Sequence, residues 1–478
     1  MSVHEECGVF GIWQKETGLV ALDTYYALYA LQHRGQESCG IAVCDDGVFR
    51  DYKDVGLVGS VFTPEILNSL GAGNMAIGHT RYGTTGGNGV VNAQPIVVNH
   101  FKGHMALAHN GNLVNAFGLR RELEQQGSIF HMTSDSEVIA YVVTRERLQA
   151  PSIEEAVNRA MYRLQGAYSL VIMSSQKLIA ARDERGFRPL CYGQRPDGAY
   201  VVASESCALD AVGARMVRDL EPGEILVFDS NGVRSIREHC GKAEQSTCIF
   251  EYIYFARPDS TIDGHGVHEA RIRAGKFLAQ DSPVDADIVV GVPDSGLDAA
   301  AGYAQQTGLP CEMGFIKNKY IGRTFIAPDQ SMREKTVRMK LNPIPDVVKG
   351  KRVVLIDDSI VRGTTSARIV RLLRDAGAKE IHMRISSPPF LNPCYYGTDI
   401  DSQDMLIACH HPVEEIGRII GADSLAYLRT ERLGELIHMP CGHGYCDACF
   451  TANYRTETPK DSGKSRFEIK LSEKEKKA

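Results

Sequence analysis

The most regular pattern of hydrophobic and polar positions lies in the second half of the chain. Short apolar runs there predict buried strands at residues 287–292, 353–356 and 380–385. An alanine-rich segment at residues 297–306 and apolar residues at helical spacing over residues 369–376 predict two helices. Strands that alternate with helices are typical of a mostly parallel sheet, so this half is expected to have a Rossmann-like α/β fold.

Strand-like segments predominate in the first half, with fewer helices between them. One buried helix is predicted at residues 24–31, and strands are predicted at residues 7–13, 38–43, 106–113, 168–173 and 200–203. The glycine-rich segment 78–86 and the Asn110-Gly111 pair are expected in turns, and Ser134 is expected to begin a helix. This pattern predicts a layered α+β domain that ends near residue 240.

Length, charge and cysteine content narrow the class of protein. The 478 residues suffice for two or three domains, and the net charge of −6 argues against a dedicated nucleic-acid-binding protein. The acidic start does not form a signal peptide, and no apolar run is long enough to span a membrane, which favours the cytoplasm. In that reducing compartment the 13 cysteines are expected to be thiols, and clustered ones to serve catalysis or metal binding.

The segment that follows the strand at residues 353–356 carries the strongest chemical signal. Asp357 and Asp358 stand where this strand ends, and a turn that contains Gly363 leads into a helix. Ligands bind at the carboxyl ends of strands in an open parallel sheet, and the free N–H groups of a helix start favour a phosphate. Because carboxylates can hold sugar hydroxyls or Mg²⁺, this segment predicts a pocket for a ribose 5-phosphate. An ordinary capped strand–turn–helix is the alternative.

A second constellation of candidate residues comprises Cys7, Arg81, Asn110, Gly111 and Asp135. Several of them have a structural interpretation when taken alone. A cysteine can be a small buried hydrophobe, Asn-Gly can form a hairpin turn, and an aspartate can cap a helix.

Taken as whole motifs, both regions resemble known families. The string from Val353 to Ser366 is similar to the signature of type I phosphoribosyltransferases, which bind phosphoribosyl pyrophosphate (PRPP). Four motifs in order resemble the class II glutamine amidotransferases, which are N-terminal-nucleophile hydrolases: Cys-Gly-Val-Phe-Gly-Ile, Gly-His-Thr-Arg-Tyr-Gly-Thr-Thr-Gly, His-Asn-Gly-Asn-Leu and Ser-Asp-Ser-Glu. A glutaminase half followed by a PRPP-binding half resembles the amidophosphoribosyltransferase family, which opens purine biosynthesis.

The resemblance implies a role for each motif in the first half. Cys7 would attack the side-chain amide of glutamine, and Asn110 and Gly111 would hold the oxyanion. The glutamine substrate would be bound by Arg34, His79, Arg81 and Asp135. In such enzymes the base is the α-amino group of the cysteine itself, so residues 1–6 are expected to be a leader that is removed.

In the second half, the resemblance implies that ammonia displaces pyrophosphate from PRPP to give 5-phosphoribosylamine. Contacts to PRPP are expected from Lys317, Arg323, Asp357, Asp358, Arg362, Gly363, Thr364, Thr365 and Ser366. Ser295 would join Asp357 and Asp358 in binding Mg²⁺. The basic segment around Lys317 and Arg323 resembles the closing loop of the family, and its alternative is a solvated charged loop.

Four cysteines resemble the ligands of the iron–sulfur branch of this family: Cys248, Cys394, Cys446 and Cys449. Four thiolates suit a [4Fe–4S] cluster, and the distance in sequence from both reaction motifs predicts a structural role. The local alternative is a zinc site formed by Cys441, His443, Cys446 and Cys449.

The expected organisation follows from these motifs. It comprises a leader at residues 1–6, an N-terminal-nucleophile hydrolase sandwich at 7–240, a phosphoribosyltransferase domain at 241–450 and a charged tail at 451–478. The resemblance also implies a homotetramer that purine nucleotides inhibit. Two other functions are considered, an amidotransferase with a different acceptor, such as a sugar phosphate, and a PRPP-sensing regulatory protein with an inactive glutaminase.

Overall fold

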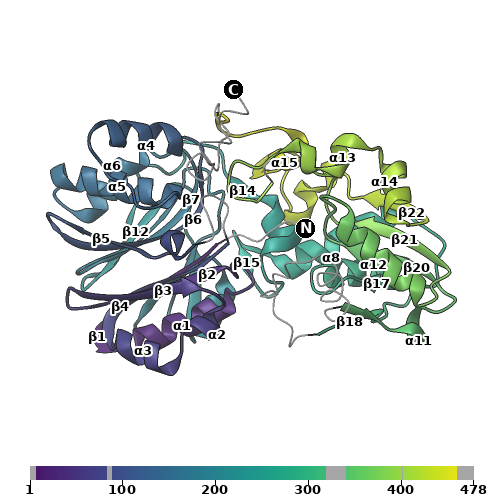
Figure 1. The fold of residues 1–478 in the computed structure, drawn as a ribbon, viewed down its shortest axis with the longest axis horizontal. Helices are drawn as coiled ribbons and strands as arrows, with labels where there is room; N and C mark the ends of the chain where they lie inside the picture. The colour runs from purple at the N-terminus through teal and green to yellow at the C-terminus, as the bar shows by residue number, and fades with distance from the viewer. Residues whose placement is uncertain (1–6, 83–88, 319–340, 401, 460–478) are drawn as a thin grey trace, which may run out of the picture.

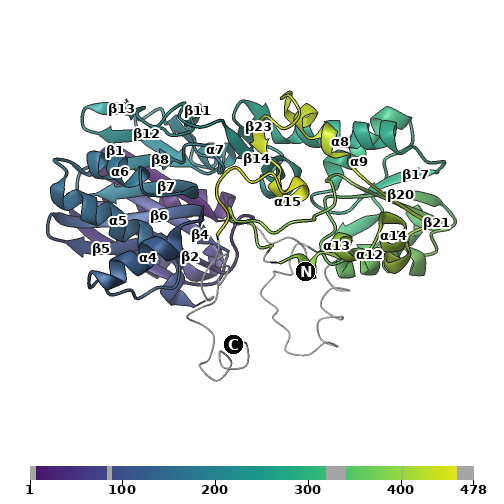
Figure 2. The same ribbon diagram turned by 90° about the horizontal axis from the view of Figure 1, so that it is seen from above.

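The protein is described by a computed structural model that places residues 7–82, 89–318, 341–400 and 402–459. Two halves lie side by side along the long axis of the molecule (Figure 1, Figure 2). The first half is a sandwich of two sheets with helices outside, and the second is a parallel sheet between helices. The expected leader, Arg323 and the tail beyond residue 459 lie outside the described residues.

The sandwich consists of a seven-stranded and a six-stranded sheet, in which the paired strands are antiparallel. The first sheet has the order β11 (Arg215–Asp219), β9 (Cys191–Gln194), β10 (Tyr200–Ala203), β1 (Gly8–Gly18), β4 (Gly73–Arg81), β2 (Ser38–Asp45), β3 (Val48–Val55). The second has the order β13 (Gly232–Ile236), β12 (Ile225–Asp229), β8 (Leu178–Arg182), β7 (Gly166–Ser174), β6 (Gly103–Leu113), β5 (Ile96–His100). The strand predicted at residues 200–203 is β10.

Alternating side chains of the strands build the layers of the sandwich. In β1, Phe10 and Ile12 pack with the helices on the outer face, whereas Val9 and Trp13 pack against the facing sheet. The outer face of the first sheet is covered by α1 (Val20–Ala30) and α7 (Ser206–Ala211), with the shorter α2 (Val58–Val61) and α3 (Pro64–Leu70) nearby. The second sheet is covered by α4 (Ala116–Gln125), α5 (Asp135–Gln149) and α6 (Ile153–Met161). The predicted hydrolase sandwich is thereby confirmed.

Two segments expected in turns are strands in the parts that bear on the sites, and residues 83–86 of the first segment lie outside the described residues. Residues 78–81 continue β4, and Asn110 and Gly111 continue β6. The reason is pairing over the full length of each strand, because β4 lies between β1 and β2, and the end of β6 runs beside β7. Asn-Gly favours a turn only where no neighbouring strand pairs with it.

The second half is built on the predicted parallel sheet, which contains a fourth strand, β22 (Ser424–Tyr427), in addition to the three predicted strands. The strand order is β17 (Ile288–Gly291), β20 (Arg352–Asp357), β21 (Glu380–Ile385), β22. Val354 and Ile356 face the helices α8 (Val267–Asp281) and α9 (Leu297–Thr307). Val353 and Leu355 face α12 (Thr364–Asp375) and α14 (Val413–Ile420). Because both faces are covered, the strand is apolar throughout.

Several small elements complete the second half. Near the sandwich, β14 (Ser246–Cys248) pairs in parallel with β23 (Gly444–Cys446), which precedes the short helix α15 (Ala448–Thr451). The remaining short elements are β15 (Thr261–Ile262), β16 (His265–Gly266), β18 (Phe315–Lys317), β19 (Leu341–Pro343), α11 (Pro345–Val348) and α13 (Ile407–His410).

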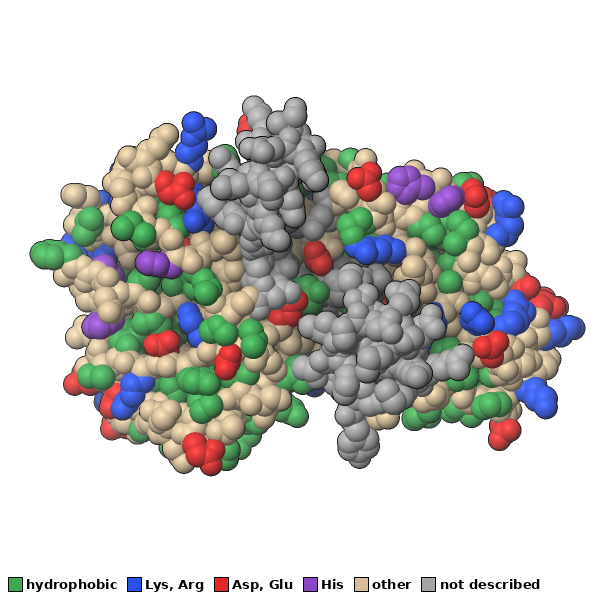
Figure 3. Space-filling model, in the orientation of Figure 1, with side chains coloured by type: hydrophobic (Ala, Val, Ile, Leu, Met, Phe, Trp, Pro, Cys, Tyr) green, Lys and Arg blue, Asp and Glu red, His purple; other side chains and the backbone are tan. Residues whose placement is uncertain are grey.

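The surface carries charges of both signs. On the face shown in Figure 3, the described acidic and basic side chains are interspersed rather than separated into large patches. Among the helices that the structure describes, none has the length and apolar character needed to cross a membrane.

Candidate active sites

The start of β1 places Cys7 beside the end of β4. Gly8 pairs with Thr80 across these antiparallel strands, so Cys7 lies next to Arg81 at the end of the ladder. Both side chains are buried, and the Cys7 thiol donates to the carbonyl oxygen of Tyr82 over 3.6 Å. The structure thus brings together the predicted nucleophile and the arginine predicted to bind the substrate carboxylate.

A contact between the two sheets brings the predicted oxyanion residues to this place. His79 on β4 donates from Nε2 to the carbonyl oxygen of His109 over 3.0 Å, directly before Asn110 on β6. Burial lowers the pKa of His79 to about 3, so the imidazole is neutral. His79 is fully buried and joins β4 to β6 through this bond, and its expected contact with glutamine stays a prediction.

Asn110 and Gly111 have the properties of oxyanion donors. The Nδ2 atom of Asn110 is buried and has no hydrogen-bond partner among the described residues. Gly111 has a φ of +142°, and a Cβ there would lie 2.1 Å from the carbonyl oxygen of Ala167. Only glycine fits such a backbone, so this position is fixed by close packing against β7.

Asp135 holds the end of β6 from the first turn of α5. Its carboxylate accepts a hydrogen bond of 2.8 Å from the Leu113 N–H. Ser134 precedes the helix at the N-cap position, as predicted, although its hydroxyl makes no capping hydrogen bond. The predicted ammonium-binding carboxylate therefore also anchors the oxyanion strand.

Arg34 is bonded to the backbone of Cys7 and to two buried carboxylates. Its buried guanidinium contacts Glu205 at 2.6 Å and Glu251 at 2.7 Å, and its Nε donates to the Cys7 carbonyl oxygen over 3.1 Å. Through these contacts Arg34 supports the backbone of Cys7. Its expected contact with glutamine stays a prediction.

A cavity of about 480 Å³ opens beside the carboxyl ends of β17 and β20. The predicted PRPP and Mg²⁺ residues on its wall are Ser295, Lys317, Asp357, Asp358, Arg362, Gly363, Thr365 and Ser366. Thr364 is exposed at the first position of α12 and does not line this cavity.

The two aspartates at the end of β20 are buried close together. Burial and the neighbouring Asp358 carboxylate raise the pKa of Asp357 well above its ordinary value, and burial also raises the pKa of Asp358. The Ser295 hydroxyl donates to the Asp358 carboxylate. Two repelling carboxylates beside a hydroxyl form an oxygen-rich donor set that fits a hard divalent cation.

The turn before α12 is shaped by Gly363. This residue has a φ of +77°, and a Cβ there would lie 2.8 Å from the Ile407 side chain. The helix therefore starts immediately after a glycine, with Thr365 and Ser366 in its first turn on the cavity wall. Free N–H groups at this helix start are suited to a phosphate.

The same cavity is also lined by residues that the sequence analysis did not predict as ligands. They are His33, Tyr254, Arg257 and Arg271 among others. Arg271 is buried on α8 and donates to the carbonyl oxygens of Tyr252, Tyr254 and Ala256. His33 comes from the first half of the chain, so the cavity is closed by both halves. No local motif signals such a contact, because it depends on how the halves pack.

Comparisons with known proteins agree with the two predicted domain types. A glutamine amidotransferase domain model matches residues 88–211, and a phosphoribosyl transferase domain model matches residues 268–387. An amidophosphoribosyltransferase of Archaeoglobus fulgidus is 50% identical over 455 residues, covering 95% of this chain and 98% of the relative. That of Bacillus subtilis is 50% identical over 464 residues, covering 96% of both chains.

The chain belongs to the amidophosphoribosyltransferase family. It is a glycosyltransferase with a glutamine amidotransferase domain, and its reaction is the first step of purine biosynthesis. A solved structure of the B. subtilis PRPP amidotransferase with ADP and GMP is 50% identical, with a TM-score of 0.88 over 95% of this chain and 98% of that chain. Nothing supports the alternative of a regulatory protein with an inactive glutaminase.

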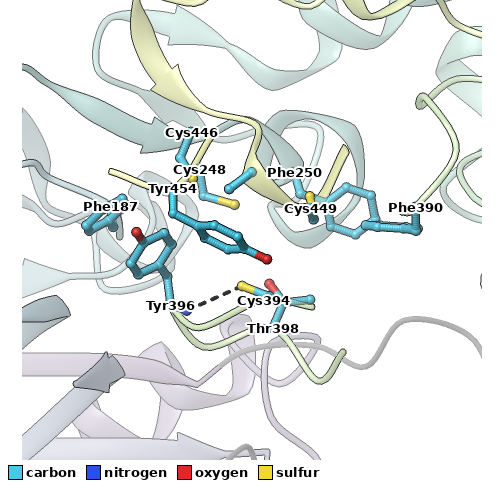
Figure 4. Close-up of a pocket in the computed structure, with 11 residues that line it drawn as sticks. Phe187, Cys248, Phe250, Phe390, Cys394, Tyr396, Thr398, Cys446, Cys449 and Tyr454 are labelled. Carbon is cyan, nitrogen blue, oxygen red and sulfur yellow. Dashed lines mark hydrogen bonds between the residues drawn. The ribbon is translucent and has the colours of Figure 1, made fainter. Parts of the chain in front are cut away.

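Four cysteines of the enzyme surround one cavity near the junction of the halves (Figure 4). They are the predicted set: Cys248, Cys394, Cys446 and Cys449. Pairing of β14 with β23 sets Cys248 opposite Cys446, α15 carries Cys449, and Cys394 comes from the loop after β21. Burial raises the pKa of the Cys446 thiol to about 12, and the neighbouring thiols act in the same direction on Cys449.

The two residues needed for the zinc alternative point elsewhere. Cys441 is exposed and does not line the cavity, and His443 pairs with Glu244 at 2.8 Å with its side chain 67% exposed. Among the described residues, no three His, Cys, Asp or Glu side chains are grouped closely enough to hold a single metal ion.

Proposed function

We propose that the glutaminase half delivers ammonia directly to the cavity of the second half, where it replaces pyrophosphate on PRPP. The observation that carries this proposal is the shared cavity wall, because His33 of the first half lines the cavity that contains Asp357 and Asp358. Free ammonia is scarce at neutral pH, so a reaction that consumes it gains from an enclosed site next to its source.

In the first half, the Cys7 thiolate forms a bond to the side-chain carbonyl carbon of glutamine. The negative charge that develops on the oxygen is held by Asn110 Nδ2 and the Gly111 N–H. Collapse of this intermediate breaks the C–N bond and releases ammonia, and water then hydrolyses the thioester to glutamate. Arg81 and Asp135 bind the α-carboxylate and α-ammonium groups. The amine of Cys7 serves as base once residues 1–6 are removed.

In the second half, the ammonia nitrogen attacks C1 of the ribose and the bond to pyrophosphate breaks. Thr365 and Ser366 hold the 5-phosphate at the start of α12, and Arg362 and Lys317 face the anionic substrate. Asp357, Asp358 and Ser295 would hold Mg²⁺, which neutralises charge on the leaving pyrophosphate. The buried carboxylate pair supports this assignment, because a cation relieves their repulsion.

The four-cysteine cavity would hold a [4Fe–4S] cluster with a structural role. Each thiolate of such a cluster binds a different iron, so its ligands lie further apart than those of one zinc ion. The support for this assignment is the arrangement of four cysteine sulfurs around one cavity.

The proposal also includes feedback inhibition of the enzyme and its location in the cell. Purine nucleotides are proposed as feedback inhibitors, since the B. subtilis relative was solved with ADP and GMP. We place the enzyme in the cytoplasm, because none of its 13 cysteines, all of which are described, forms a disulfide, as expected in a reducing compartment. The homotetramer stays a prediction.

The Cys7→Ala variant tests the division of labour between the halves. It should lose synthesis from glutamine but keep synthesis from ammonia at alkaline pH, measured as PRPP-dependent pyrophosphate release. The matched control is Cys39→Ser, a buried cysteine of the same sheet outside the proposed site, which should keep both activities. Loss of both activities in folded Cys7→Ala protein would show that Cys7 is structural.

A further inference from the structure

A loop of the second half reaches the oxyanion strand of the first. This 394–397 loop consists of Cys394, Tyr395, Tyr396 and Gly397. Asn112 on β6 donates from Nδ2 to the Tyr395 carbonyl oxygen over 2.9 Å. The buried Arg188 of the first half donates twice to the Tyr396 carbonyl oxygen, at 3.1 Å from Nε and 2.6 Å from Nη2.

Gly397 at the end of the loop packs directly on Gly111. It has a φ of +122°, and a Cβ there would lie 3.4 Å from the Gly111 carbonyl carbon and 3.0 Å from Arg188 Nη2. The proposed oxyanion donor therefore has backbone of the second half against it on one side and β7 on the other. The position of Gly111 therefore depends on the position of the 394–397 loop.

The other end of the loop is part of the four-cysteine cavity. Cys394 and Tyr396 both line it, and the Tyr396 N–H donates to the Cys394 sulfur over 3.4 Å (Figure 4). The Tyr396 ring stacks on Phe187 of the first half, with ring centroids 4.1 Å apart. Only two residues, Tyr395 and Tyr396, thus separate a cysteine of the cavity from Gly397, which contacts Gly111.

We propose that the 394–397 loop is a positioning element through which the four-cysteine site sets the geometry of the glutaminase oxyanion hole. The proposal rests on the functions assigned above to Gly111 and to the four cysteines. It predicts that a disturbance of the loop slows glutamine hydrolysis while synthesis from ammonia continues, because the second cavity does not use these contacts. The effect falls on kcat rather than KM, since the oxyanion forms only during reaction.

The Gly397→Ala variant tests the close approach to Gly111. We expect kcat for glutamine hydrolysis to fall about tenfold or more, with KM for glutamine, synthesis from ammonia and iron content unchanged. Gly103→Ala is the matched control, because Gly103 has a φ of +123° but its nearest contact would be 3.8 Å away. Unchanged kcat in folded Gly397→Ala protein, or an equal loss in Gly103→Ala, would overturn the proposal.

A milder variant covers the case in which Gly397→Ala does not fold. Asn112→Ala removes the side-chain donor to Tyr395 without adding an atom. It should lower kcat for glutamine hydrolysis a few-fold and leave synthesis from ammonia intact. Equal losses of the two activities would instead indicate a general packing role and contradict the proposal.

The link to the cysteine site is tested by hydrogen exchange in Cys394→Ser. Amide exchange of a peptide that spans β6 should become faster, and kcat for glutamine hydrolysis should fall, in parallel with loss of iron. Cys311→Ser, an exposed cysteine outside the cavity, is the control and should change neither. Loss of iron without a change in β6 exchange would overturn the link.

The measurements on wild-type protein and on the variants distinguish failure of the proposed loop role from failure of the glutaminase and cluster assignments. Wild-type protein without glutaminase activity, or without iron, would contradict the function assigned to the site concerned. A wild type with both properties, combined with unaltered Gly397→Ala and Asn112→Ala variants, would contradict only the role of the loop.

Discussion

At the scale of single residues, side chains at the proposed sites can be distinguished from side chains that position them. Asp357 and Asp358 could be predicted from sequence, because a strand end in a parallel sheet fixes where its next residues point. The contacts of Arg34 and His79 could not, since they involve partners distant in sequence, such as Glu251 and His109. Motifs therefore predicted which residues lie near Cys7, but not the buried contacts that hold them.

Asn110→Ala tests the oxyanion assignment at this scale. Removal of the unpaired amide should lower kcat for glutamine hydrolysis by about 10²–10³-fold, as loss of one oxyanion donor does in other enzymes. Synthesis from ammonia should be unaffected, and parallel assays with both nitrogen donors provide the check. The matched control is Asn115→Ala, whose side chain bonds residues 163 and 165 at the edge of the same domain. A loss below threefold would remove Asn110 from the oxyanion hole.

Arg34→Met tests the buried ion pairs. It leaves Glu251 buried without its closest cation, which should cost about 3–5 kcal/mol of stability. Arg195→Met breaks a partly exposed pair with Asp23 and should cost about 0–1 kcal/mol. Thermal unfolding followed by circular dichroism compares them, and equal shifts would show that the Arg34 contacts are not special.

At the scale of elements, hydrophobic patterns predicted strands well where the whole strand is buried. They predicted strands poorly where pairing with a distant strand determines the conformation. The strand β21 occupies the predicted residues 380–385, since both of its faces are covered. Asn110 and Gly111 were expected in a turn, yet β7 pairs with β6 through both residues. Pairing between strands that are distant in sequence leaves no local signal.

A carboxyl pair between elements of the two halves gives a pH prediction. Burial, with a smaller contribution from Asp263, raises the pKa of Asp219 on β11 above its ordinary value of 3.8, and Arg182 pairs with Asp263. Because the pKa of Asp219 is higher in the folded than in the unfolded protein, this group contributes stability that is fully present below the unfolded-state pKa. That stability is lost as the pH rises through the folded-state pKa. Asp219→Asn should therefore gain thermal stability relative to wild type as pH rises from about 4 to 8. A difference that does not vary with pH would contradict this.

At the scale of the whole molecule, the two domain types could be predicted, but the contacts between them could not. The four cysteines were assigned from resemblance and then found around one cavity. In contrast, His33 in the second cavity and Gly397 against Gly111 follow only from the packing of the halves. The first contact supports the proposed transfer of ammonia between the sites, and the second supports the proposed role of the 394–397 loop.

Removal of the leader belongs to this scale, because it concerns how the chain matures. An amide nitrogen at Cys7 is not a usable base, whereas a free α-amine is. Intact mass spectrometry of active enzyme should show a chain that begins at Cys7. Full glutaminase activity in protein that retains Met1 or Ser2 would require a different base.

The central claim is that one chain couples glutamine hydrolysis to amination of PRPP. The most direct measurement is the yield of glutamate and pyrophosphate when purified enzyme is incubated with glutamine, PRPP and Mg²⁺. The account predicts equal amounts of both products, and pyrophosphate release that stops when both glutamine and ammonia are omitted. Glutamate formed without pyrophosphate, or with a sugar phosphate as the preferred acceptor, would contradict it.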